Sequence, residues 1–184
     1  MNFSGMLLDS DVLAEIRKAD PDPAVVAFLR RRSFRHMYIS VLSIGELKGL
    51  YPYPETDRWI TELLERFGDH VINVDARVSL EWAGRQAPRG VHAVGRDDAG
   101  PLPTAALEGL MAASASAYDL ELISSKAQVY RAWGVQASNR GLRIKTLPDA
   151  PPRVHPCVNS CENPLSSVNR RRVSSLIRGM IEGR

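Results

Sequence analysis

The chain has 184 residues, 44% of them hydrophobic, and its 24 Lys and Arg against 21 Asp and Glu give a formal charge of +3. This length and composition suit one globular domain and exclude a chain that is disordered throughout. No stretch approaches the roughly 18 uncharged apolar residues of a membrane-spanning helix, and the start MNFSGMLLDSD meets an acid too early for a secretory signal. With two cysteines, both outside the expected core, the sequence predicts a cytoplasmic protein with no membrane association.

The surplus positive charge is confined to the end of the chain. Residues 149–184 hold six Arg against Asp149, Glu162 and Glu182, which leaves residues 1–148 neutral. Composition changes at the same place, where DAPPRVHP is rich in proline and NSCENPLSS is small and polar. We therefore expect one domain over residues 1–148, followed by a Pro- and Arg-rich, poorly ordered tail over residues 149–184.

Strand and helix patterns alternate along the expected domain. A strand at residues 6–8 precedes a helix through residues 12–16, which stops at DPDP, and a second helix over residues 25–32. There follow a strand at residues 37–40, a helix that opens at residues 43–46 and a helix at 59–67. A strand at 71–74, a Gly- and Pro-rich loop at 88–103, a helix at 104–118 and strands at 120–123 and 142–145 complete the pattern. Strands separated by helices predict an α/β protein with a parallel sheet covered on both faces.

Three acids stand in uncharged surroundings. Glu46 is the only charge in MYISVLSIGEL, and Glu108 is the only charge in LPTAALEGLMAASASAY. Helices that are small or apolar on every side are normally buried, and a buried carboxylate is costly unless it meets a cation or becomes protonated. Asp9 directly follows an apolar strand, and Ser40 ends the next one. Because ligands bind beyond the carboxyl ends of parallel strands, we expect the three acids to converge.

Convergent carboxylates are hard oxygen ligands and suit Mg²⁺ or Mn²⁺, which also hold substrate phosphates. Such a metal lowers the pKa of a bound water and orients it for attack on phosphorus, so a phosphodiesterase is the natural chemistry. Asp11 is a candidate ligand, acceptor or water-positioning group. Ser10, Ser40 and Ser124 are candidate polar neighbours of the site.

Each acid also has a purely structural interpretation. The segment Ser43-Ile-Gly-Glu46 matches a capping box, in which the glutamate returns a hydrogen bond to the start of its own helix. Asp9 could be an acidic residue beside a helix N-terminus. Glu108 could form a private salt bridge with an arginine from elsewhere.

The segments MLLDSDVLAEIRK, YISVLSIGELKGL and LEGLMAASASAYDLELISS occur in the order and rough spacing found in PIN-domain ribonucleases of the VapC toxin type. The usual wording of that family is LLDTNVLSE, YISVITIGELRRG and a D-G-L-I-A-A-T-A helix followed by a short strand and T-R-N. The resemblance covers about residues 5–147. It implies a three-layer α/β/α sandwich with a mostly parallel sheet, metal-dependent RNA cleavage, frequent homodimers and a cognate antitoxin protein.

By position, the resemblance assigns Asp9, Glu46 and Glu108 as metal ligands, with Asp11 assisting catalysis. Glu108 stands where the family normally has Asp, and Asp11 stands where Asn is common. The family often has a fourth acid after T-R-N, whereas here Ser124-Ser125-Lys126 leads into AQVY without one. These departures leave open a degenerate PIN domain that binds antitoxin or RNA without cutting, and a structural protein whose acids are salt-bridged.

A compact basic cluster, which we call the arginine cluster, comprises Arg30, Arg31, Arg32 and Arg35. Arginines supply most of the affinity for a nucleic-acid backbone, so these four are candidate RNA-binding residues. A solvated helix end, where cations suit the negative end of the helix dipole, is the alternative.

Overall fold

The computed structural model describes residues 3–86, 104–139 and 142. Five parallel strands lie in the order β3-β2-β1-β4-β5. They are β1 (Gly5–Leu8), β2 (Met37–Ser40), β3 (Val71–Ile72), β4 (Leu120–Ile123) and β5 (Ala137–Ser138). Because β1 pairs with both β2 and β4, the order of the strands reverses at β1, and open parallel sheets bind ligands at such a switch point.

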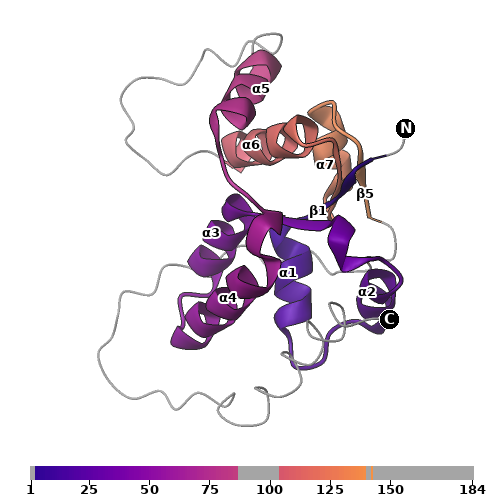
Figure 1. The fold of residues 1–184 in the computed structure, drawn as a ribbon, viewed down its shortest axis with the longest axis vertical. Coiled ribbons are helices and arrows are strands. Elements are labelled where there is room, and N and C mark those ends of the chain that lie inside the picture. The colour runs from indigo at the N-terminus through magenta and orange to yellow at the C-terminus, as the bar shows by residue number, and fades with distance from the viewer. Residues whose placement is uncertain (1–2, 87–103, 140–141, 143–184) are drawn as a thin grey trace.

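Helices cover both faces of the sheet, so the predicted three-layer α/β/α architecture is confirmed (Figure 1). One layer contains α1 (Ser10–Arg17), α2 (Pro23–Arg30), α3 (Val41–Leu50) and α4 (Pro54–Phe67). The other contains α5 (Ala76–Gln86), α6 (Thr104–Ala117) and α7 (Ala127–Ala132). Two short 3₁₀ turns, η1 (Phe34–His36) and η2 (Gly68–His70), precede β2 and β3.

The core divides according to the two-residue period of the strands. Met6 and Leu8 of β1 pack with the first helical layer, whereas Leu7 packs with α6 and α7. All three side chains are buried. Both faces of the central strand are thus apolar, which is typical of a parallel sheet covered on both sides.

Two helix starts follow local sequence signals. Asp22 caps α2 by accepting a hydrogen bond from the Ala24 backbone N–H at 2.7 Å, and Pro23 occupies the first turn. The helix predicted to open at Ser43 instead begins at Val41, and Ser40 caps it by accepting from the Leu42 N–H at 3.1 Å. That prediction was wrong by about half a turn, because Ser40 offers a cap oxygen directly after the strand.

Several other predicted boundaries need correction. The third strand ends at Ile72, and Val74 lies beyond it with a half-exposed side chain. Helices α5 and α7 and strand β5 were not among the predicted elements. Leu142 lies outside any strand, and residues 143–145 of the expected last strand are outside the described residues, as are the loop at 88–103 and the proposed tail.

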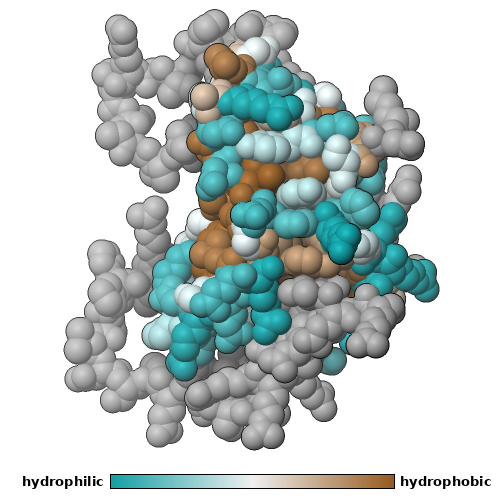
Figure 2. Space-filling model, viewed as in Figure 1, coloured by the Kyte–Doolittle hydropathy of each residue, from teal (hydrophilic) through white to brown (hydrophobic). Residues whose placement is uncertain are grey.

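Helix α3 is less buried than its mostly apolar sequence predicts. Only Ser43 and Leu47 of its ten residues are buried. Figure 2 shows apolar surface between α6 and α3, on the face seen in Figure 1. Leu42 and Leu110 are partly exposed, and Leu80 of α5 is 75% exposed. The expectation of burial failed for α3, whereas most of α6 from Gly109 to Ala117 is buried as expected.

Candidate active site

Asp9 lies at the carboxyl end of the central strand, where the sheet order reverses. Its backbone N–H donates to the carbonyl of Ile123 at the end of β4, so β1 and β4 end side by side. Its carboxylate Oδ1 accepts from the Ser10 N–H at 2.8 Å, which makes Asp9 the N-cap of α1. The structural interpretation as a helix-start acid is therefore correct, but it accounts for only one of the two oxygens.

Ser10 joins the first two predicted acids. The Ser10 hydroxyl donates to Oε2 of Glu46 at 2.6 Å. The oxygen of this hydroxyl also lies 3.4 Å from Oδ1 of Asp9. Ser43 is inside α3 rather than at its start, and its hydroxyl donates to the Leu8 carbonyl at 3.4 Å. The capping-box alternative for Glu46 is thus wrong, because Glu46 lies in the second turn of α3 and is held by a residue of α1.

Asp11 is buried, with 1% of its surface exposed, and all of its hydrogen bonds are on one oxygen. Oδ2 accepts from the hydroxyl of Ser124 at 3.2 Å, from the N–H of Ser125 at 2.7 Å and from the Ser125 hydroxyl. Oδ1 is buried and has no hydrogen-bond partner. Burial and the nearby charge of Asp9 raise the pKa of Asp11 from 3.8 to about 6, against the lowering effect of the Ser125 hydrogen bonds.

Glu108 lies in the second turn of α6 and is partly buried. Burial raises its pKa, the charge of Lys126 lowers it, and the charges of Asp9 and Glu46 raise it further. The fold therefore brings Glu108 into electrostatic contact with both other acids. Among the ion pairs of the described residues none involves Glu108, so the predicted arginine partner is not found in that part of the chain.

The accessory serines have structural partners of their own. Ser124 directly follows β4, and besides donating to Asp11 its hydroxyl oxygen accepts from the Lys126 N–H at 3.0 Å. Ser40 is fully buried and caps α3, so its side chain is committed to the helix start. The turn from Ser124 to Lys126 is therefore tied to the acid cluster through Asp11.

Tyr130, a residue that the sequence did not single out, lies on α7 with only 3% of its surface exposed. Its hydroxyl donates to Oδ2 of Asp9 at 2.9 Å. Burial and the charge of Asp9 strongly raise the pKa of Tyr130, so the phenol keeps its proton. The available signal was the pair Ala127 and Tyr130, which at a spacing of three residues forms the buried face of a short helix.

The donor chemistry of this acid cluster suits a hard divalent cation. Asp9, Asp11, Glu46 and Glu108 offer only carboxylate oxygens, and the unpartnered Oδ1 of Asp11 is a buried acceptor that lacks a donor. As they stand, however, no three His, Cys, Asp or Glu side chains of the described ranges are arranged to hold an ion. Repulsion between the acids, which adds to the larger effect of burial in raising the pKa of Asp11 and of Glu108, disfavours a tighter grouping without a cation.

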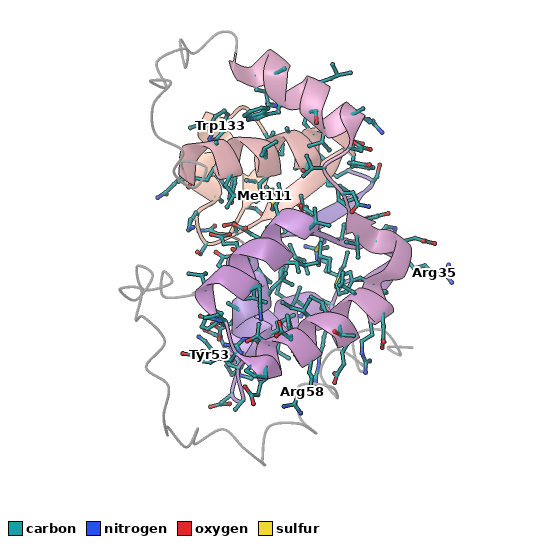
Figure 3. All side chains as sticks on the ribbon, turned by 90° about the vertical axis from the view of Figure 1, so that its left-hand side faces the viewer. Arg35, Tyr53, Arg58, Met111 and Trp133 are labelled. Carbon is teal, nitrogen blue, oxygen red and sulfur yellow. The ribbon has the colours of Figure 1, made fainter. Side chains whose placement is uncertain are left out.

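The arginine cluster lies near the amino ends of the strands, whereas the acids lie beyond their carboxyl ends. Arg35 belongs to η1, directly before β2, whereas Ser40 at the far end of β2 adjoins the acid cluster. Figure 3 shows Arg35 pointing away from the ribbon, far from Met111 of α6. All four arginines are exposed, and none forms an ion pair with another described residue.

The fold and the position of the acids define a PIN-like α/β protein. No family model matches the chain. It is 29% identical over 119 residues to the VapC ribonuclease Y4jK of Sinorhizobium fredii, covering 59% of this chain and 85% of that protein. The resemblance identified from the three sequence motifs is thereby confirmed.

Two solved structures share the fold. The crystal structure of FitAcB from Neisseria gonorrhoeae matches with a TM-score of 0.57 and 22% identity, over 73% of this chain and 97% of that chain. The structure of FitAB bound to an IR36 DNA fragment matches with a TM-score of 0.59 and 20% identity, over 74% and 95% of the two chains. At these identities the likeness extends to the fold.

Proposed function

We propose that the protein is an endoribonuclease that uses Mg²⁺ or Mn²⁺ to hydrolyse RNA phosphodiester bonds, as the toxin of a toxin and antitoxin pair. One observation carries this proposal. The Ser10 hydroxyl connects Asp9 with Glu46, and the charges of both acids act on Glu108, at the strand ends where the sheet order reverses. Similarity to a VapC ribonuclease supports RNA as the substrate.

In this proposal Asp9, Glu46 and Glu108 hold the metal, and Asp11 assists. When bound, the metal supplies a water of lowered pKa and offsets charge on phosphorus oxygens. A bound cation would offset the repulsion between these carboxylates. Asp11 fixes the turn that carries Lys126, whose ammonium group offsets the charge of Glu108 and is available to a substrate phosphate.

The test is cleavage of labelled RNA by the purified chain with Mg²⁺, with Mn²⁺ and with a chelator. We expect metal-dependent cleavage that falls by at least about 100-fold in Asp9→Asn, Glu46→Gln and Glu108→Gln, since each removes a ligand charge. Glu65→Gln, an exposed position on α4, is the matched control and should cleave normally. Cleavage that survives the chelator, or equal activity in Asp9→Asn, contradicts the mechanism.

A second candidate function is binding of antitoxin or RNA without cleavage. The observation that favours it is Lys126, whose charge acts on Glu108 from within the protein and competes with a metal for the same carboxylate. Helix α7 also brings a phenol to the cluster and no carboxylate. RNA binding without turnover in either metal would favour this function, and Lys126→Met should then strengthen binding of Mn²⁺.

We further propose two protein partners, a cognate antitoxin and a second copy of this chain. Support for the second copy comes from the uncovered apolar side chains of α3, α5 and α6, since exposed apolar surface of this kind is typical of interaction sites. No helix among the described residues has the length and apolar character needed to span a membrane.

A further inference from the structure

The carboxylate of Asp9 is held at both oxygens by donors from different parts of the chain. Oδ1 accepts from the Ser10 N–H at 2.8 Å, and Oδ2 accepts from the Tyr130 hydroxyl at 2.9 Å. Tyr130 lies 121 residues further along the chain, on a helix that follows β4. The bond therefore ties the second helical layer to the acid at the end of β1.

Packing alone does not account for the hydroxyl of Tyr130. The ring belongs to the apolar cluster that contains Leu122, Met111 and Ala127, and a phenylalanine would fill the same volume. The hydroxyl is the only polar atom of this side chain, and its partner is a buried carboxylate surrounded by other acids. A polar group in such a place needs a partner, and here it finds the first acid of the cluster.

Asp9 needs such a restraint because of its neighbours. Its charge acts on Asp11 and on Glu108, and repulsion from like charges favours rotation of the carboxylate away from them. A donor at each oxygen fixes the plane of the group and opposes that rotation. Residues that orient metal-binding carboxylates in this way contribute strongly to metal affinity.

We infer that Tyr130 is a positioning residue of the acid cluster: its hydroxyl holds the Asp9 carboxylate in the orientation in which Ser10 links it to Glu46, ready for a divalent cation. This inference rests on the proposed metal site. Tyr130 lies on the helix after Ser124-Ser125-Lys126, so α7 contributes a neutral donor to the cluster. A donor holds the first acid in place and adds no negative charge to an already crowded group.

The test compares Tyr130→Phe with a matched control, Tyr118→Phe. The Tyr118 hydroxyl donates to Oδ2 of Asp75 at 2.8 Å, so the control loses the same type of bond away from the acid cluster. The affinity for Mn²⁺ alone is measured by electron paramagnetic resonance, with trimethylamine N-oxide present so that both variants are compared in the folded state. We expect Mn²⁺ to bind at least about 10-fold more weakly to Tyr130→Phe and with unchanged affinity to Tyr118→Phe.

The outcomes separate this inference from the function beneath it. If the wild type binds Mn²⁺, Asp9→Asn does not, and Tyr130→Phe binds as tightly as the wild type, the positioning role of Tyr130 is overturned and the metal site stands. If the wild type itself binds no Mn²⁺, the metal site is overturned and the role of Tyr130 with it. Weaker binding to both tyrosine variants would also overturn the inference, because it would show a general loss of stability.

Discussion

Replacing Asp11 by asparagine should stabilise the metal-free protein, and increasingly so as the pH rises. All three hydrogen bonds that Asp11 accepts end on Oδ2, so the amide oxygen of asparagine can take over this position. The amide N–H₂ then occupies the place of Oδ1, which has no donor in the wild type. A neutral side chain also no longer repels Asp9.

The pKa of Asp11 gives the size and sign of this effect. The pKa is raised from 3.8 to about 6 in the folded state, so between these values the folded protein holds a proton that the unfolded chain has lost. Stability contributed by this group therefore falls as the pH rises from about 4 to about 7. At about 1.4 kcal/mol per pKa unit the full difference is about 3 kcal/mol, of which about 2 kcal/mol develops between pH 4.5 and pH 7.5.

Urea unfolding in the presence of a chelator measures this difference. The free energy of unfolding of Asp11→Asn minus that of the wild type should be larger by about 2 kcal/mol at pH 7.5 than at pH 4.5. Asp20→Asn, an exposed position, is the control and should show no such trend. A difference that is constant with pH, or that shrinks as the pH rises, would refute the reasoning about Asp11.

Three further predictions concern packing, metal binding and assembly. Gly109→Ala should destabilise the folded protein by about 1–2 kcal/mol, because a Cβ there would lie 2.8 Å from the Trp133 ring. Gly45→Ala should instead stabilise it by up to about 1 kcal/mol, because a Cβ there would meet no atom within 4 Å. Urea unfolding of the two variants measures both changes in the free energy of unfolding. Mn²⁺ at about 100 times its Kd should raise the melting temperature of the wild type by about 5–10 °C and leave that of Asp9→Asn unchanged. Calorimetry measures both temperatures, and an equal rise in the two proteins would contradict this prediction. Leu80→Asp should lower the mass measured by light scattering from dimer to monomer, and an unchanged mass would exclude this surface from the interface.

The three candidate acids could be singled out from the sequence because their signals are local. Asp9 follows a short apolar strand, Glu46 is the only charge in MYISVLSIGEL, and Glu108 is the only charge in its helix, so each stood out without knowledge of the others. The parallel order of the strands places Asp9 close enough to Glu46 for Ser10 to link them, and both acids act on Glu108 through their charges. What the sequence did not reveal was the link through Ser10, since a serine after an aspartate is equally compatible with an ordinary helix start.

Two of the three missed elements, α7 and β5, depend on packing for their stability. Helix α7 has six residues and β5 has two, lengths at which local preference is too weak to mark an element. They form because Ala127 and Tyr130 bury against the sheet and because β5 adds to the edge of β4. The residue that the sequence analysis overlooked, Tyr130, lies in this segment for the same reason.

The position of the arginine cluster has a consequence for how RNA would bind. Strand β2 separates Arg35 from Ser40, and four residues at about 3.3 Å each span about 13 Å. An RNA that reaches the acid cluster must therefore continue for several nucleotides along the surface before it meets these arginines. Short substrates would then be cleaved equally well by the wild type and by Arg31→Gln/Arg35→Gln, whereas longer ones would lose affinity in the variant. An equal loss of affinity for short and long substrates would mean that the arginines act on the acid cluster itself. Their place at the opposite end of the strands argues against this.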